Sequence, residues 1–401
     1  MSRRCSTALG RARALALPLA LFGLGIAGCG GHANQDPTTS ASASLTAHQA
    51  NQEPDSPAPA PADVAPAEAD AEDEAAPEAE PGISALDAGD LRPLTDDERA
   101  RFFAGHGDEL APTDIHYVKS NEIRHDVWFP YIAELGGAYV GVGSDQNYTL
   151  IATAKSDLVF LMDIDRRVVD LHAIYGILIA ASEDAETLFT RWDGANADAS
   201  IALIEEALAG ADEAELRRML RSFKGSRETV FRNLRHVINR TRDGAPTSWL
   251  SNPEMYDHIR KLWLAGRVRT LGGNFVGDSG LQTVGKVAAD LGIPVRVLYM
   301  SNAEEYFRYN DAFATNIKAL VGDDRSVALR TIYSKDWVHA DNLWGYQVQP
   351  LVDFQARLDD KKNRSRNPML RYAEQDGTLQ RTTSVEGLSL LAVPEAPLAG
   401  G

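Results

Sequence analysis

Cysteine is almost absent from this 401-residue sequence, which contains only Cys5 and Cys29. Cys5 lies in an amino-terminal segment that we expect to be removed, so the mature chain would keep one cysteine and no internal disulfide. A disulfide framework is therefore excluded. Any folded domain must be held together by its apolar core.

Long hydrophobic runs are also scarce at the amino terminus. The apolar stretch at 14–28 has 15 residues, which is too short to span a bilayer, and it follows arginines at positions 3, 4, 11 and 13. A basic segment followed by a short apolar run is typical of an export signal. We predict that residues 1–28 are a signal peptide.

The end of this segment, Ile26-Ala27-Gly28-Cys29, resembles the lipobox of bacterial lipoproteins, in which the cysteine is acylated and becomes the new amino terminus. The resemblance implies lipidation at Cys29 and attachment to the membrane of the cell envelope. Gly30 stands where an aspartate would favour the inner membrane, which implies the outer membrane. The alternative is an ordinary secreted protein with a chance cysteine at its cleavage site.

Lysine and arginine are missing from residues 30–80, which carry 11 acidic residues and many Ala, Pro and Ser residues. Such a composition cannot bury enough apolar surface to offset the entropy of ordering. We predict that 29–93 is a disordered tether, with a root-mean-square span of roughly 40 Å over the residues that lack basic charge. The folded domain is then 94–401.

A basic stripe is missing from the folded part as well. The whole chain has a formal charge of -17, and without the signal and tether about -10 remains on the domain. An acidic domain repels phosphate backbones, so we expect no nucleic-acid partner. The expected partners are the membrane, through the anchor, and a small-molecule ligand, whereas the sequence identifies no protein partner.

The folded part alternates strands with helices. The strands are expected at 138–142, 158–162, 268–275, 295–300 and 326–333, and the helices at 94–113, 121–135, 168–181, 251–265 and 280–291, with a helical insertion at 183–250. Alternation of this kind indicates a parallel sheet. The predicted fold class is α/β, a Rossmann-like three-layer αβα domain with a mostly parallel sheet.

The first two predicted strands carry a nucleotide-binding pattern. The first ends in Gly141-Val142-Gly143, a helix capped by Ser144 or Asp145 follows, and the second strand ends in Asp163. Glycines allow backbone N–H groups to approach a ligand, and an acid at this position binds ribose hydroxyls. The alternative is a tight turn beside an exposed acid that could be removed at little cost.

Several segments resemble an uncharacterised family of bacterial lipoproteins and related proteins: YVGVGSDQNYTLI, FLMDID, DLH, GGNF with GLQTVGK, and VLYMSNAEEY. The similarity covers about 120–333. It implies a class I S-adenosylmethionine methyltransferase-like domain that would bind S-adenosylmethionine or another adenosine-type ligand. The implied site comprises Gly141, Gly143, Asp163, Asn274, Ser301 and Asn302, and we add Ser144, Asp145 and Asn147, which fill the turn where a third glycine would stand.

The sequence departs from methyltransferases in lacking an acid before its glycines, where Tyr139 stands, and in lacking a catalytic motif. Our leading hypothesis is therefore a binding or scaffold module, followed by a methyltransferase and then by a hydrolase using Ser279 of the GDSG stretch. For Ser279 or Asp278 we favour a helix cap, and for Ser301 a capping box is as plausible as ligand contact. No metal is expected, because Asp163, Asp165, Asp170 and His172 share no ligand spacing, and His172 is expected to be a hydrogen-bonded core residue.

Overall fold

The computed structural model describes residues 91–110, 113, 116–333, 336–341 and 343–396. The predicted signal peptide, Cys29 and nearly all of the predicted tether lie outside these residues. Within them, none of the helices combines the length and the apolar character needed to cross a bilayer.

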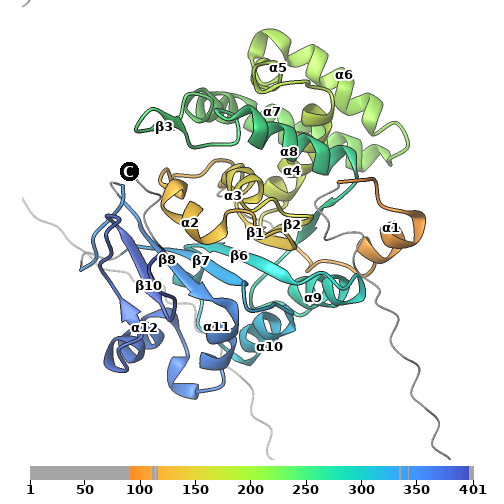
Figure 1. The fold of residues 1–401 in the computed structure, drawn as a ribbon. Helices are drawn as coiled ribbons and strands as arrows, with labels where there is room; N and C mark the ends of the chain where they lie inside the picture. Colours follow the sequence, from red (N-terminus) through yellow and green to blue (C-terminus); the bar gives the residue numbers. More distant parts are fainter. Residues whose placement is uncertain (1–90, 111–112, 114–115, 334–335, 342, 397–401) are drawn as a thin grey trace, which may run out of the picture. The chain divides into compact units, whose positions relative to one another are not determined.

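An eight-stranded sheet organises the described residues, in the order β5-β2-β1-β6-β7-β8-β10-β9 (Figure 1). Its first five strands are parallel: β5 (Val268–Gly272), β2 (Leu158–Asp163), β1 (Ala138–Val142), β6 (Val295–Ser301) and β7 (Val327–Ile332). β8 (Gly345–Pro350) runs antiparallel to β7, β10 (Leu388–Leu391) is parallel to β8, and β9 (Leu379–Gln380) is antiparallel to β10. The predicted mostly parallel sheet is confirmed.

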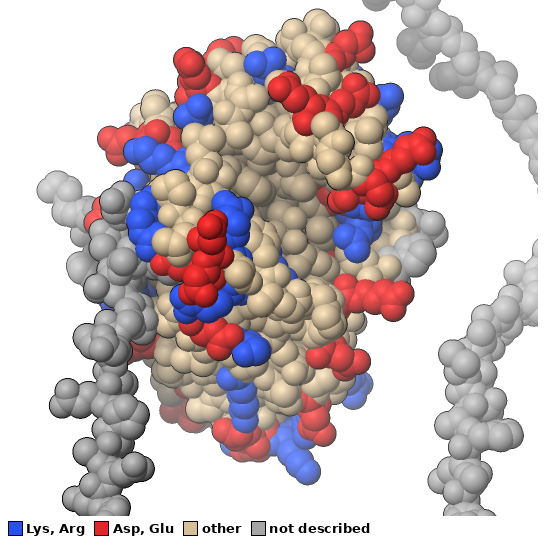
Figure 2. Space-filling model, turned by 90° about the vertical axis from the view of Figure 1, so that its right-hand side faces the viewer, with Lys and Arg blue, Asp and Glu red and all other residues tan. Residues whose placement is uncertain are grey.

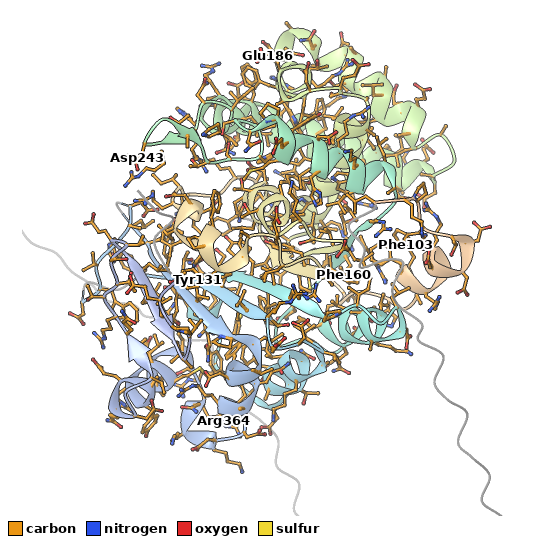
Figure 3. The ribbon with its side chains drawn as sticks, in the orientation of Figure 1. Phe103, Tyr131, Phe160, Glu186, Asp243 and Arg364 are labelled. Atoms are coloured by element: carbon orange, nitrogen blue, oxygen red, sulfur yellow. The ribbon has the colours of Figure 1, made fainter. Side chains whose placement is uncertain are left out.

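Helices cover both faces of this sheet (Figure 1). One face packs on α3 (Gln146–Ala154), α4 (Arg166–Ala180) and α8 (Pro253–Leu264), and the other on α9 (Gly280–Asp290), α10 (Asp311–Ala319) and α11 (Leu351–Arg357). Successive residues of β2 point to opposite faces, so Leu161 joins the first core and Phe160, labelled in Figure 3, joins the second. The Rossmann-like three-layer αβα class is thus confirmed.

The helical insertion follows α4 and packs against it. It comprises α5 (Ala185–Arg191), α6 (Ala197–Ala207) and α7 (Glu213–Val237), followed by a two-stranded hairpin of β3 (Thr241–Arg242) and β4 (Ala245–Pro246). Figure 3 marks Glu186 on the outer helices and Asp243 at the hairpin turn. Side chains of α7 such as Phe223 and Val230 are buried at regular helical spacing, while its other faces are polar.

Two predicted helices are much shorter than expected. α1 (Asp96–Phe102) has the capping box of Thr95 and Glu98 but ends well before residue 113. The segment 121–135 forms only a 3-10 turn (His125–Trp128) and the single turn α2 (Phe129–Ile132). There the N–H groups of Ile123 and Arg124 donate to the Tyr346 hydroxyl, at 3.2 and 3.0 Å, instead of to helical carbonyls.

Some predicted boundaries and caps also differ. β5 ends at Gly272 and not at residue 275. α8 begins at Pro253 and not at residue 251, and its cap is Asn252, whose side chain accepts from the N–H groups of Glu254 and Met255. The carboxyl-terminal region, which had no clear pattern, adds the 3-10 turn Lys361–Asn363 and α12 (Arg366–Gln375) between β8 and β9.

Candidate functional site

The carboxyl edge of the parallel strands brings the predicted site residues to one side of the sheet. From β1 the chain proceeds to β2 and β5 in one direction, and it then returns to β6 and β7 on the other side of β1. A crevice at such a reversal is where open α/β sheets bind ligands. The predicted residues lie at the ends of four neighbouring strands there: Gly143, Ser144, Asp145 and Asn147 after β1, Asp163 at the end of β2, Asn274 after β5, Ser301 at the end of β6 and Asn302 directly after it.

Gly143 is held from both sides by the predicted acid and a core histidine. Its N–H donates to Asp163 Oδ2 at 3.1 Å, and its carbonyl accepts from His172 Nε2 at 2.7 Å. Its φ of +84° lies in the left-handed region that favours glycine. The glycine turn after β1 and the acid after β2 therefore form one connected unit.

Asp163 is not the freely exposed acid considered above. It is half-buried, and Oδ1 accepts a second backbone bond, from the Asp165 N–H at 2.9 Å. Burial raises the pKa of Asp163 to about 6, although the bonds from Asp165 and Gly143 oppose this shift. Its removal would leave two N–H groups without their acceptor.

His172 is a hydrogen-bonded core residue, as expected. Its Nδ1 accepts from the Tyr148 hydroxyl at 3.0 Å, which leaves the proton on Nε2 for the Gly143 carbonyl. Burial lowers the pKa of His172 to about 4, so the ring is neutral at physiological pH.

The two glycines fit against side chains of their own chain. A Cβ added at Gly141 would lie 2.1 Å from Asn147 Oδ1, and one at Gly143 would lie 2.4 Å from Gln146 Nε2. Asn147 is fixed in this place by a bond from the Tyr139 hydroxyl at 2.8 Å and by its own bonds to the carbonyls of Val142 and Ser144. Internal packing alone thus explains both glycines, and a ligand could approach Gly143 closely only if Gln146 moved.

Asp145 stands at the N-cap position of α3, but its side chain does not cap the helix. It is buried and accepts from Asn233 Nδ2 of α7 at 2.9 Å, while burial raises its pKa. The neighbouring Ser144 hydroxyl donates to Gln146 Oε1 at 3.0 Å. The predicted capping role of these two residues is wrong, and Asp145 instead connects the turn to the insertion.

A buried carboxylate that the sequence did not reveal lies at the reversal of the sheet. Glu122 accepts from three hydroxyls: Ser301 at 2.5 Å, Tyr299 at 2.7 Å and Thr331 at 2.9 Å. His125 Nε2 lies 3.4 Å from the same carboxylate, and Gln146 Nε2 donates to the Tyr299 hydroxyl. We call this set, namely Glu122, His125, Gln146, Tyr299, Ser301 and Thr331, the switch-point cluster.

Ser301 therefore does not form the capping box considered above. Its backbone is left-handed, with φ of +51°, and only the 3-10 turn Ala303–Glu305 follows it, without a side-chain cap. Asn302 lies beside the cluster, and its Nδ2 donates to Glu305 Oε2 at 3.2 Å.

The GDSG loop binds a carboxylate of the same chain. Asp108 Oδ1 accepts from the N–H groups of Asp278 and Ser279, at 3.0 and 2.9 Å, and Oδ2 accepts from the Asn274 N–H at 2.8 Å. Burial opposes ionisation, but these bonds hold the pKa of Asp108 below its ordinary value. The predicted site edge at Asn274 is thus occupied by Asp108.

Ser279 is at the N-cap position of α9 but makes no side-chain cap bond. Its hydroxyl donates to Asp108 Oδ1 at 3.2 Å, so the favoured prediction of a Ser279 cap is wrong. The hydroxyl is bonded to a carboxylate and not to an imidazole, which is not the arrangement that activates a serine nucleophile.

The carboxyl edge of the sheet has one feature that suits an adenosine-type ligand and one that does not. Asp163 is partly exposed and has lone pairs left for ribose hydroxyls, whereas the N–H of Gly143 is already bonded and Gln146 covers its Cα. Among the described residues, no group of three or more His, Cys, Asp or Glu side chains is placed to hold a metal ion.

A family model described as a domain of unknown function, DUF7790, matches residues 117–392, which is more than half of the chain. The protein therefore belongs to this family. No curated protein matches the sequence. Among solved structures, the chain is similar to the rRNA methyltransferase aviRa from Streptomyces viridochromogenes, with 11% identity and a TM-score of 0.26 over 60% of this chain and 83% of that one. Similarity at this level supports no conclusion about the site.

Proposed function

We propose that this protein is a lipid-anchored, exported binding or scaffold module whose methyltransferase-like domain binds an adenosine-type ligand. The lipobox at Cys29 and the acidic segment after it support the anchor and tether. The observation that carries the ligand proposal is the bonded unit of Gly143 and Asp163 at the ends of adjacent parallel strands.

Asp163 is the expected ribose contact. Each carboxylate oxygen accepts one backbone N–H, which leaves further lone pairs for ligand hydroxyls. With a pKa of about 6, the group is ionised at neutral pH and accepts charge-assisted hydrogen bonds. Gln146, whose side chain covers Gly143, would move aside to admit the ligand.

The structure of the switch-point cluster favours the hypothesis of a binding module over that of an enzyme. The Glu122 carboxylate is 2% exposed and is already bonded to three hydroxyls of its own chain. A group so enclosed reaches no substrate unless its partners move. An exported domain would also not ordinarily meet S-adenosylmethionine, which is made in the cytoplasm.

A methyltransferase is the second candidate, favoured by the same cluster in one respect. Glu122 and His125 bring a carboxylate and an imidazole together at the sheet reversal, where a proton acceptor for methyl transfer would be needed. Transfer of the methyl group from S-adenosylmethionine to an added hydroxyl or amine acceptor, with release of S-adenosylhomocysteine and with the acceptor's proton taken up by the enzyme, would favour this candidate if Glu122→Gln still folds but abolishes it. The hydrolase hypothesis is not taken further, because the Ser279 hydroxyl is bonded to Asp108.

The test of ligand binding is a thermal-shift panel of S-adenosylmethionine, S-adenosylhomocysteine, adenosine and AMP on the full mature chain. We expect at least one adenosine compound to raise the melting temperature of the wild type, and Asp163→Ala to lose roughly tenfold to a hundredfold in affinity. Asp184→Ala is the matched control, since Asp184 also accepts a backbone N–H, from Thr187 at 2.7 Å, but lies in the insertion. If no adenosine compound stabilises the wild type, or if both variants respond alike, the ligand proposal fails.

The anchor is tested separately. Cys29→Ser should release the protein from membranes, and the wild type should carry an acyl mass at its new amino terminus. A wild type without acyl mass, together with a variant that stays in the membrane fraction, would show that Cys29 is not the attachment point.

A further inference from the structure

A cavity of about 330 Å³ lies between the first turns of α4 and the amino-terminal half of α7. Arg166 and Arg167 line it from α4, and Arg218, Arg221 and Ser222 line it from α7. We call the four arginines and the space between them the arginine pocket. It is distinct from the switch-point cluster, with which it shares no residue.

The two carboxylates that also line the pocket already have partners. Asp165 accepts from the Arg167 N–H at 2.9 Å and lies 2.8 Å from His116 Nδ1. Asp170 accepts from Arg218 Nε at 3.1 Å and from the Ser222 hydroxyl at 3.0 Å. Among the lining residues that the structure describes, four arginines against two carboxylates leave an excess of positive charge.

Three of these arginines are unmatched. Within the part of the chain that the structure describes, the side chains of Arg166, Arg167 and Arg221 make no hydrogen bond or ion pair. Other arginines of α7 do so: Arg217 pairs with Glu213, and Arg232 pairs with Glu228. Arg167 also reaches across to α7, since a Cβ added at Gly225 would lie 3.5 Å from its Nη1.

The concentration of positive charge runs against the rest of the molecule. The chain as a whole has a net charge of -17, and the face drawn in Figure 2 carries acidic and basic side chains side by side. Like charges gathered without partners in a concave site destabilise one another, and a bound anion relieves that repulsion. The pocket is therefore built for a negatively charged occupant.

We propose that the arginine pocket binds the phosphate group of a small, soluble phosphorylated compound. Guanidinium groups match the oxygens of a phosphate in pairs, which a compact lysine ammonium does not. The amino-terminal end of α4, a 15-residue helix, adds its dipole at the same place. A cavity of this size accommodates a phosphate and a small organic part, whereas the negative charge of the protein disfavours a long polyanion.

The proposal stands independently of the adenosine-type ligand at Asp163. Isothermal titration of the full mature chain would use inorganic phosphate, glycerol 3-phosphate and glycerol as probes. We expect both phosphate compounds to bind and glycerol not to bind. Vesicles containing phosphatidate test the other source of the same chemistry, and preferential binding to them would overturn the assignment to a soluble compound.

The informative variant is Arg166→Gln combined with Arg221→Gln, which removes two unmatched charges without breaking a bond of the described residues. Affinity for glycerol 3-phosphate should fall at least about tenfold. Arg232→Gln is the control, because Arg232 lies on the same helix about 16 Å further along and outside the pocket. It should bind within about twofold of the wild type.

Two further readouts separate the possible failures. An unchanged melting temperature of the unliganded double variant excludes unfolding as the cause of lost binding. Asp163→Ala should keep its phosphate affinity even if it loses the adenosine response, so either proposal can fail alone. Absence of phosphate binding to the wild type, or an equal loss in Arg232→Gln and the double variant, would overturn the pocket assignment.

Discussion

The switch-point cluster and the arginine pocket are both polar, but they differ in whether their charged groups have hydrogen-bond partners within the protein. In the cluster, Glu122 is enclosed by hydroxyls that bond to it from β6, β7 and their surroundings. In the pocket, Arg166, Arg167 and Arg221 line a cavity without partners from the described residues. In the first region the Glu122 carboxylate is bonded to its own chain, although His125 Nδ1 is buried without a partner among the described residues, and the second region is open to an external anion.

The difference teaches where polar residues maintain the fold and where they are available to a ligand. A buried acceptor with three donors contributes to stability because its loss would leave those donors unpaired. An exposed or partly exposed cation without a partner contributes little to stability, and its charge gains a favourable interaction only when an anion binds. Variants of the switch-point cluster should therefore lower the stability of the protein, whereas variants of the arginine pocket should lower its affinity for an anion.

The largest effect on stability is expected for Glu122→Ala. The change removes the shared acceptor of Tyr299, Ser301 and Thr331, and we expect the free energy of unfolding to fall by about 3 kcal/mol. Urea denaturation measures this change, and Glu206→Ala on the exposed side of α6 is the control, expected within about 0.5 kcal/mol of the wild type. If the free energy of unfolding falls no further than in the control, the three hydroxyls do not depend on Glu122 as their hydrogen-bond acceptor.

A smaller loss is expected for Gly143→Ala, at about 1 to 3 kcal/mol. The added Cβ would lie too close to the Gln146 side chain, and the alanine backbone would have to keep the positive φ of Gly143. Gly244→Ala is a matched control, since Gly244 has φ of +80° but no heavy atom within 4 Å of an added Cβ. The difference between the two variants isolates the contact with Gln146, and equal losses would show that backbone strain alone accounts for Gly143.

The contribution of Asp163 to the free energy of unfolding should change with pH by an amount similar to, or smaller than, the loss expected for Gly143→Ala. Its folded pKa of about 6 lies above its ordinary value, so between about pH 4 and 6 the folded protein holds a proton that the unfolded chain has released. The stability contribution of Asp163 therefore falls as pH rises through this window, by about 1 to 3 kcal/mol given its partial exposure.

His172 acts in the opposite sense over nearly the same range. Its lowered pKa means that stability is lost as pH falls from about 6.5 towards 4. The Asp163 contribution must therefore be measured as the difference in unfolding free energy between the wild type and Asp163→Asn at each pH. A difference that does not vary with pH between 4 and 7 would contradict the raised pKa.

The smallest effect on stability is expected in the arginine pocket. The combined Arg166→Gln and Arg221→Gln variant should unfold within about 0.5 kcal/mol of the wild type in the absence of phosphate. In contrast, Arg218→Gln breaks the bonded pair with the buried Asp170 and should cost more than the double variant. The reverse order would show that the two exposed arginines have structural partners after all.

The sequence predicted the sheet better than the site. Strands can be identified from neighbouring residues, whereas the site depends on contacts between residues that are far apart in the chain. The apolar run at 138–142 and Gly143 directly after it place β1 at its observed residues, and the run at 158–162 places β2 within one residue. Both strands are buried on two faces, so continuous apolar character identifies them locally. The helical insertion was equally visible from its spacing of apolar residues.

Glu122 could not be predicted in this way. Its partners lie more than 170 residues away along the chain, on β6 and β7, and its own segment has a helical spacing of apolar residues that the tertiary bonds to Tyr346 override. The predicted cap at Ser279, and the capping box that was one of two alternatives for Ser301, are wrong for a related reason. Each serine fits a local capping pattern, but a distant carboxylate accepts from its hydroxyl. Asp163 was placed correctly, since a strand end fixes it.

The segment before residue 117 lies outside the family match, but it is hydrogen-bonded to the matched part of the chain. The family match begins at 117, yet Arg269 donates to the carbonyls of Phe102 and Ala104, Arg267 donates to that of Arg92, and Asp108 fills the GDSG loop. Arg267 and Arg269 are at most 6% exposed with this segment in place, and a chain cut at the family border would lose the carbonyls of Arg92, Phe102 and Ala104 together with the backbone that covers both side chains. The folded unit of this protein therefore begins before the family match, and it includes the residues that supply these acceptors.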